Sequence, residues 1–170
     1  KVQAPIYVRL ADRARKYADF APTPSKGTMR DINISNIVAY GSANLTSSIT
    51  GVPGSVIENI SLNNIQLYNE GNLPDNSYFK SASEVPEMEK SYPQPDFWGK
   101  CLPASALFIR HAKNVMITNM NIAPDQEDPR TPIIADDVDG LIIKDVIRSK
   151  KYTAKQLYIG TNVRDVQINK

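Results

Sequence analysis

The sequence predicts an all-β protein, a right-handed parallel β-helix of about five to six coils. Three observations support this fold class. The stretch "ENISLNNIQL" at 58–67 recurs in similar form as "DINISNIVA" at 31–39 and as "NVMITNMNI" at 114–122. Apolar and polar residues alternate within each copy, which is typical of a strand with one buried face. An amide or acid side chain occupies the same place in every copy, at Asn36, Asn64, Asn119 and Asp145.

The spacing of these corner residues indicates a repeating backbone. Successive corners lie 28, 55 and 26 residues apart, so the middle step equals about two ordinary ones. Units of this length cannot bury their own apolar faces, so they must stack on one another. The side chains expected to stack are Ile32, Ile34 and Ile37; Ile60, Leu62 and Ile65; Val115, Ile117 and Met120; and Leu141, Ile143 and Val146, with Val166 and Ile168 beginning one more copy.

A second short apolar run precedes each copy. The runs are "PIYVRL" at 5–10, "SSITGV" at 47–52, "ALFIRH" at 106–111, "PIIADD" at 132–137 and "QLYIGT" at 156–161. Each unit is therefore predicted to contain two or three strands of about four to six residues joined at polar corners. The amides at one corner are expected to form a hydrogen-bonded ladder from coil to coil.

Two segments interrupt the repeat within one domain that spans 1–170. Residues 11–28 form the first, and "ADRARKYADF" at 11–20 is expected to be a loop, with a helical turn as the alternative. The second is a long loop insert at 69–104, which contains five prolines and the only tryptophan. Loops of this length in a compact domain are usually functional or disordered.

Other folds and several classes of partner are less compatible with the sequence. A two-sheet sandwich also has short strands at regular spacing, but it does not require matching corner residues; leucine-rich-repeat spacing is absent. A formal net charge of +2 gives no electrostatic argument for nucleic acid, and no apolar run of about 20 residues predicts membrane insertion. One cysteine, Cys101, and one histidine, His111, provide no metal-ligand spacing, so no metal or cofactor is predicted.

Six segments in order resemble a known enzyme family. They are "APIYVRLADR", "GTMRDINISNIVAYG", "SSITGVPGSVIENISLNNIQLYNEG", "VPEMEKSYPQPDFWG", "LPASALFIRHAKNVMITNMNI" and "EDPRTPIIADDVDGLIIKDV". Together they resemble the C-terminal part of bacterial glycoside hydrolase family 28, the polygalacturonases and related pectin-cleaving enzymes. The resemblance implies a pectin-lyase-like β-helix, an extracellular or periplasmic location, an acidic plant polysaccharide as partner, and inverting hydrolysis by two carboxyl groups without a metal.

The motifs that carry catalysis in that family are missing here. The sequence has no Asn-Thr-Asp, no His-Gly and no Arg-Ile-Lys, and Asp136-Asp137 lacks the family's preceding glycine. His111 does not match the family histidine and is expected to be an exposed turn residue, with Asp136-Asp137 a solvated corner. No catalytic residue is therefore assigned, and the catalytic coils are expected upstream of Lys1. The alternative is a non-catalytic carbohydrate-binding or scaffold module.

Four residues are predicted to bind substrate. Arg9 and Arg13 carry guanidinium groups, which offer two parallel donors to a uronate carboxylate. Tyr92 and Trp98 in the long insert are aromatic rings able to stack on pyranose faces, and the alternative is that they pack the insert onto the body of the β-helix. Glu87 and Glu89 also lie in this insert, but two acids on a loop are weak support for acid–base catalysis. Exposed strand edges further predict self-association, or a partner chain, at the N-terminal coil face.

Overall fold

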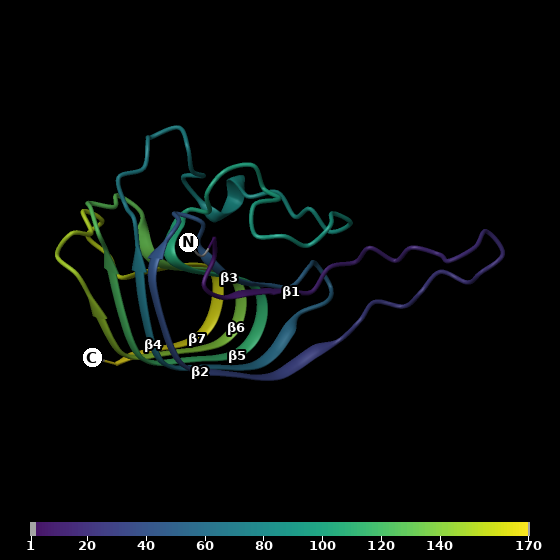
Figure 1. Ribbon diagram of the computed structural model, residues 1–170. Helices are drawn as coiled ribbons and strands as arrows, with labels where there is room; N and C mark the ends of the chain where they lie inside the picture. Colours follow the sequence, from purple (N-terminus) through teal and green to yellow (C-terminus); the bar gives the residue numbers. More distant parts are fainter. Residues whose placement is uncertain (1–2, 170) are drawn as a thin grey trace.

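The computed structural model describes residues 3–169 and confirms an all-β chain whose named strands pair only in parallel (Figure 1). In this described part there is no α-helix, only a single 3₁₀ turn, η1 (Ala82–Glu84). The strands are β1 (Tyr7–Arg9), β2 (Met29–Ser42), β3 (Ser47–Thr50), β4 (Ile57–Asn69), β5 (Ala104–Pro124), β6 (Thr131–Arg148) and β7 (Tyr158–Asn169).

The sheet has two connected rows of strands. One row runs β2–β4–β5–β6–β7, and the other runs β1–β3–β5–β6–β7. β5 belongs to both rows, because its first part pairs with β3 and its second part with β4. The long strands curl as they pass from one row to the other, so the sheet has the form of a half-barrel (Figure 1).

The register confirms the expected alignment of apolar side chains. Ile34 pairs with Leu62, Leu62 with Ile117, and Ile117 with Ile143. The rows that begin at Ile32 and at Ile37 align in the same way. These side chains lie inside the curl and form one continuous apolar core. The alternation of polar and apolar residues therefore identified the buried face of each strand.

Left-handed residues bend the strands at the predicted corners. Asn36, Asn64, Asn119 and Asp145 have φ values of 59°, 54°, 50° and 54°. Asn and Asp enter this region more readily than most residues, which explains their recurrence. Asn64 Nδ2 donates to Asn36 Oδ1 at 2.7 Å, and Asn119 Nδ2 donates to Asn64 Oδ1 at 3.2 Å. The ladder is thus present over three of these four positions.

The corners bend the long strands without ending them, so the predicted strand length of four to six residues holds for β3 but is wrong for β2, β4, β5, β6 and β7. β5 continues for 21 residues through left-handed bends at His111, Asn114 and Asn119. A second, unpredicted amide ladder accompanies the middle bend. In it Asn59 Nδ2 donates to Asp31 Oδ1 at 2.7 Å, and Asn114 Nδ2 donates to Asn59 Oδ1 at 3.0 Å. Hydrogen bonds between side chains therefore connect neighbouring strands at the bend, where the backbone pairing is interrupted.

The two interrupting segments differ in how they meet the body. Residues 11–28 contain no helix and project from the sheet as an extended arm (Figure 1). The segment between β4 and β5 folds back over the outer face of the β3–β5–β6 region. There Val85, Trp98 and Leu102 form a second apolar cluster with Phe108 of β5 and Ile134 of β6. No helix in the described residues is long and apolar enough to cross a membrane.

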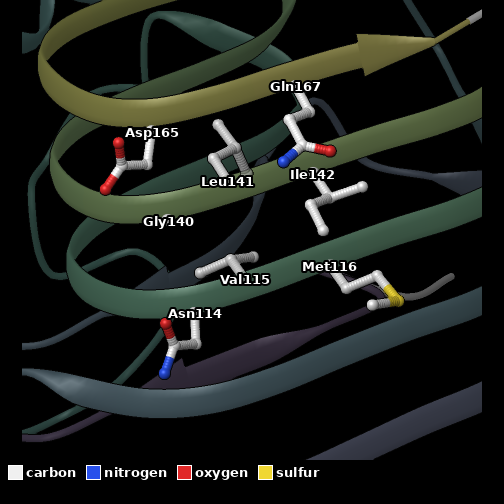
Figure 2. Close-up of a pocket in the computed structure, with 8 residues that line it drawn as sticks. All are labelled: Asn114, Val115, Met116, Gly140, Leu141, Ile142, Asp165 and Gln167. Carbon is white, nitrogen blue, oxygen red and sulfur yellow. The ribbon is translucent and has the colours of Figure 1, made fainter.

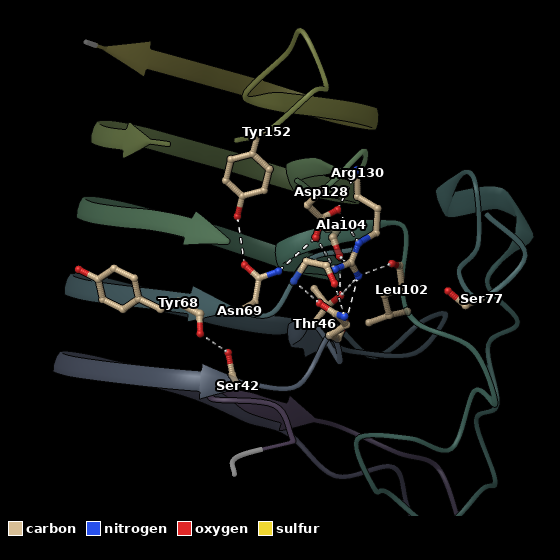
Figure 3. Close-up of polar contacts among 12 residues, drawn as sticks. Ser42, Thr46, Tyr68, Asn69, Ser77, Leu102, Ala104, Asp128, Arg130 and Tyr152 are labelled. Carbon is tan, nitrogen blue, oxygen red and sulfur yellow. Dashed lines mark hydrogen bonds and ion pairs between the residues drawn. The ribbon is translucent and has the colours of Figure 1, made fainter. Parts of the chain in front are cut away.

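A buried ion pair joins three connections at one end of the sheet (Figure 3). Arg130 binds Asp128 through two parallel hydrogen bonds, with Nε 3.1 Å from Oδ1 and Nη2 2.8 Å from Oδ2. Both side chains are fully buried. Asn69 Nδ2 also donates to Asp128, and Tyr152 donates its hydroxyl to Asn69. Burial raises the pKa of Tyr152 to about 12, so this hydroxyl keeps its proton at neutral pH.

Candidate functional site

A row of polar side chains crosses the outer face of the sheet beside the long insert. It contains Arg9 of β1, Thr50 of β3, Arg110 of β5, Asp136 of β6 and Thr161 of β7, all in register. The preceding residue on each strand belongs to a row that includes Ile49 and faces the core. Because successive strand residues point to opposite faces, the side chains of the polar row point away from the core. We call these five residues and the insert side chains that touch them the charged row.

Arg110 lies at the centre of the charged row. Its Nη2 is 2.8 Å from Glu87 Oε1, and its Nη1 donates to the carbonyl of Val85 at 2.7 Å. Its Nε lies 3.0 Å from Asp136 Oδ2, an ion pair without the alignment of a hydrogen bond. The Arg110 side chain is only 13% exposed. It therefore fastens the long insert to β5 and β6.

His111 follows at the bend and lies between two carboxylates. Its Nε2 is 2.9 Å from Glu87 Oε2, and its Nδ1 is 2.7 Å from Asp137 Oδ2. The expectation of an exposed turn residue was wrong, because His111 is buried beneath these acids. A protonated imidazole donates to both carboxylates, whereas a neutral one donates to a single carboxylate. The imidazole is thereby held between the insert and β6.

The Asp136-Asp137 pair is divided between two environments, so the expected solvated corner is correct for only one of them. Asp136 is buried and accepts from Asn162 Nδ2 at 3.3 Å as well as facing Arg110. Asp137 occupies the left-handed bend with φ of 52°, and its side chain is largely exposed. The two environments differ because Asp136 lies in the strand beside Arg110, whereas Asp137 stands at the bend beside His111.

Arg9 lies at the β1 end of the charged row. Its Nη1 donates to the carbonyl of Gly51 at 3.0 Å, and its Nη2 donates to the carbonyl of Glu87 at 2.6 Å. The guanidinium lies 5.4 Å from the centre of the Phe97 ring. Partial burial lowers the pKa of Arg9 from its ordinary value, although an arginine keeps its charge at any physiological pH.

Arg13 and Tyr92 form a separate pair of a cation and an aromatic ring. The Arg13 guanidinium lies 5.0 Å from the centre of the Tyr92 ring, and Tyr92 is 65% exposed. Among the described residues, no carboxylate forms an ion pair with Arg13, and its Nε is buried without a hydrogen-bond partner. The structure thus brings two of the predicted binding residues together, and the Arg13 guanidinium has no carboxylate partner among the described residues.

Trp98 does not present a ring to the surface, so it packs the insert onto the body, the alternative to stacking on a sugar. The side chain is only 8% exposed, and its indole nitrogen donates to the carbonyl of Pro86 at 3.1 Å. One face of the ring packs against Phe97 at a centroid distance of 3.9 Å. Trp98 stabilises the insert on the sheet and is not part of the candidate site.

The sequence analysis missed that Glu87, Arg110, His111 and Asp136 meet. A signal was present, because "IRH" and "ADD" occupy matching places in consecutive units, 26 residues apart. The contribution of Glu87 had no such signal, since the path of the insert follows no repeat. Within residues 3–169, no three His, Cys, Asp or Glu side chains are grouped so as to hold a metal ion.

Comparison with models of protein families, with curated proteins and with solved structures finds no match for this chain. The geometry of the site is therefore what indicates its chemistry. That geometry has two parts, the closed charged row around Arg110 and the open pair of Arg13 and Tyr92.

Proposed function

We propose that the chain forms coils of a right-handed parallel β-helix and serves as the substrate-binding part of a pectin-type glycoside hydrolase. The solenoid interpretation is supported by the parallel register, in which β2, β4, β5, β6 and β7 align equivalent residues. It is supported further by the two amide ladders, which recur at the same bends. Stacked units that share bends and core rows are typical of repeat architectures.

The observation that carries the proposed function is the Arg13–Tyr92 pair. An arginine without an acidic partner offers parallel N–H donors to a carboxylate, the group that distinguishes a uronate from a neutral sugar. The exposed tyrosine ring beside it provides an apolar face for the C–H side of a pyranose. Arg9 also lies over an aromatic ring, that of Phe97, but its two terminal nitrogens already donate to the carbonyls of Gly51 and Glu87, so the free donors are those of Arg13. An acidic polysaccharide of the pectin type supplies both the carboxylates and the apolar sugar faces that this pair could bind.

The charged row supports binding better than bond cleavage. Inverting hydrolysis needs a protonated acid and a base carboxylate about 6.5–9.5 Å apart, both facing the same glycosidic bond. Glu87 and Asp136 instead hold Arg110, while Glu87 and Asp137 hold His111. Carboxylates that are paired with Arg110 and His111 in this way hold the insert on the sheet and do not face a glycosidic bond together. We therefore assign the chain a binding role, and we place it outside the cytoplasm, where a plant polysaccharide is encountered.

Replacing Arg13 with alanine is expected to weaken binding of polygalacturonate about tenfold, because a hydrogen bond to a charged group contributes about 1.5–3 kcal/mol. Tyr92→Ala is expected to weaken it as well. Isothermal titration calorimetry at two salt concentrations measures the affinity. Arg15→Ala is the matched control, since Arg15 is an exposed arginine on the same arm and loses the same charge.

Equal losses in Arg13→Ala and Arg15→Ala would mean that net charge alone attracts the polymer, and the assigned site would be wrong. No binding by the unmodified chain would favour the alternative of a scaffold module. Release of reducing ends from polygalacturonate by this chain alone would overturn the assignment of a binding role without catalysis.

A further inference from the structure

The second amide ladder has a missing side chain at Gly140. Five residues stack at this bend, Asp31, Asn59, Asn114, Gly140 and Asp165, and all have left-handed φ values. The first three are joined by hydrogen bonds between side chains. A Cβ built on Gly140 would lie 3.1 Å from Asn114 Oδ1. That oxygen accordingly accepts no hydrogen bond from any described group.

The missing side chain opens a pocket of about 290 Å³ on the outer surface (Figure 2). One wall is the bend itself, with Asn114, Gly140 and Asp165. The other wall is the neighbouring column of Met116 and Ile142, capped by Gln167. Met116 is 43% exposed, so its thioether is available to a ligand. The volume lies at the lower end of the range for ligand pockets, which suits a single small ring.

The charges around the pocket favour a neutral ligand. The Asp165 carboxylate, which forms no ion pair with any described residue, repels an anion. The adjacent column contains Glu58, Lys113, Asp139 and Arg164 in register, two anions and two cations, so it adds no net charge that would attract an ion of either sign. The polar wall offers acceptors, Asn114 Oδ1 and the carboxylate, and therefore requires donors from the ligand. Hydroxyl groups supply such donors without charge.

We infer that this pocket binds one neutral pyranose, with hydroxyls donating to Asp165 and Asn114 and the apolar ring face against Met116 and Ile142. The site is distinct from the charged row and does not depend on the uronate-binding role of Arg13. It would let the protein contact a neutral sugar residue while an acidic polymer occupies the other surface.

Gly140→Asn tests this inference by supplying the missing side chain. Asn tolerates the left-handed backbone at position 140, and its amide can donate to Asn114 Oδ1 as the other ladder members do. The variant is expected to remain folded and to weaken binding of methyl galactopyranoside about tenfold. The matched control is Gly54→Asn, because Gly54 also has positive φ and has open space around it.

Binding is followed by NMR shifts of the Gly140 backbone amide and the Gln167 side-chain amide during titration with methyl galactopyranoside, methyl glucopyranoside, galacturonate or methylammonium. The neutral glycosides are expected to shift both signals in the unmodified chain and in Gly54→Asn. If Gly140→Asn fails to fold, Asp165→Asn, which removes the charge and replaces one acceptor oxygen with a donor amide, is expected to weaken binding several-fold. Unchanged affinity in these variants, no shift with either glycoside, or tighter binding of galacturonate or methylammonium would each overturn the inference. Polygalacturonate binding is expected to survive Gly140→Asn, which separates this site from the one at Arg13.

Discussion

Arg130→Met is expected to lower the free energy of unfolding by about 3–5 kcal/mol, because it leaves the buried Asp128 carboxylate without its cation. The loss extends beyond the ion pair. Arg130 Nη1 also lies within hydrogen-bonding distance of the carbonyls of Asn44, Leu102 and Ala104, at 3.1–3.3 Å (Figure 3). These carbonyls belong to the β2–β3 connection, the end of the long insert and the start of β5. One side chain thus holds three segments together.

Urea denaturation followed by circular dichroism measures this loss. Arg164→Ala is the control, since Arg164 forms an exposed ion pair with Asp139 at 3.0 Å, and such pairs contribute about 0–1 kcal/mol. The double variant Arg130→Met with Asp128→Leu is expected to recover part of the stability, because it removes the unpaired charge. A loss in Arg130→Met no larger than that in Arg164→Ala would show that the Arg130–Asp128 pair does not fasten these connections.

Ile117→Ala is expected to lower the free energy of unfolding by about 2–5 kcal/mol. Ile117 is fully buried at the middle of the sheet, between Leu62 of β4 and Ile143 of β6. Truncation leaves a cavity at position 117. Leu62 and Ile143 cannot move to fill it, because each is fixed by the pairing of its own strand.

The same substitution on the opposite face provides the control for Ile117→Ala. Ile147 belongs to β6 and is 68% exposed, so Ile147→Ala is expected to change stability by no more than about 0.5 kcal/mol. Chemical denaturation of both variants gives the comparison. Similar losses at the two positions would mean that the assignment of inner and outer faces is incorrect.

The inner rows and the main corners could be predicted because they repeat. Ile34, Leu62, Ile117 and Ile143 occur at equal distances from an amide or acid that the backbone needs for a left-handed bend. The apolar alternation and the bend residue are both local patterns, and both occur several times in the sequence. Strand lengths were underestimated because the amide ladders continue the pairing through the bends.

The charged row could be predicted only in part, because its acidic partner from the long insert, Glu87, comes from a segment that appears once. Glu87 reaches Arg110 and His111 from the long insert, and no periodicity fixes the path of such a segment. Trp98 was misplaced for the same reason, since exposure on an irregular loop depends on what it packs against. Arg9 and Arg13 were identified from charge and position alone, and the structure places both beside aromatic rings.

Association at the N-terminal face stays a prediction. Ile32, Ile34 and Ile37 on the edge strand β2 are only partly buried, whereas their partners on β4 are fully buried. A further layer over β2 would complete their burial, in keeping with the tendency of exposed strand edges to pair.

The central claim is that the strands stack in parallel register, one layer on the next. Double electron–electron resonance tests it directly by measuring the distance between spin labels at Asn33 of β2 and Gln167 of β7. Both labels are attached to introduced cysteines in a Cys101→Ser background. These outward positions occupy one column through Ser61, Met116 and Ile142. Four inter-strand spacings of about 4.8 Å predict a narrow distribution near 19 Å between the backbone positions, widened by the label linkers. A distance far longer than four spacings, or a broad distribution without a maximum there, would contradict the stacked arrangement.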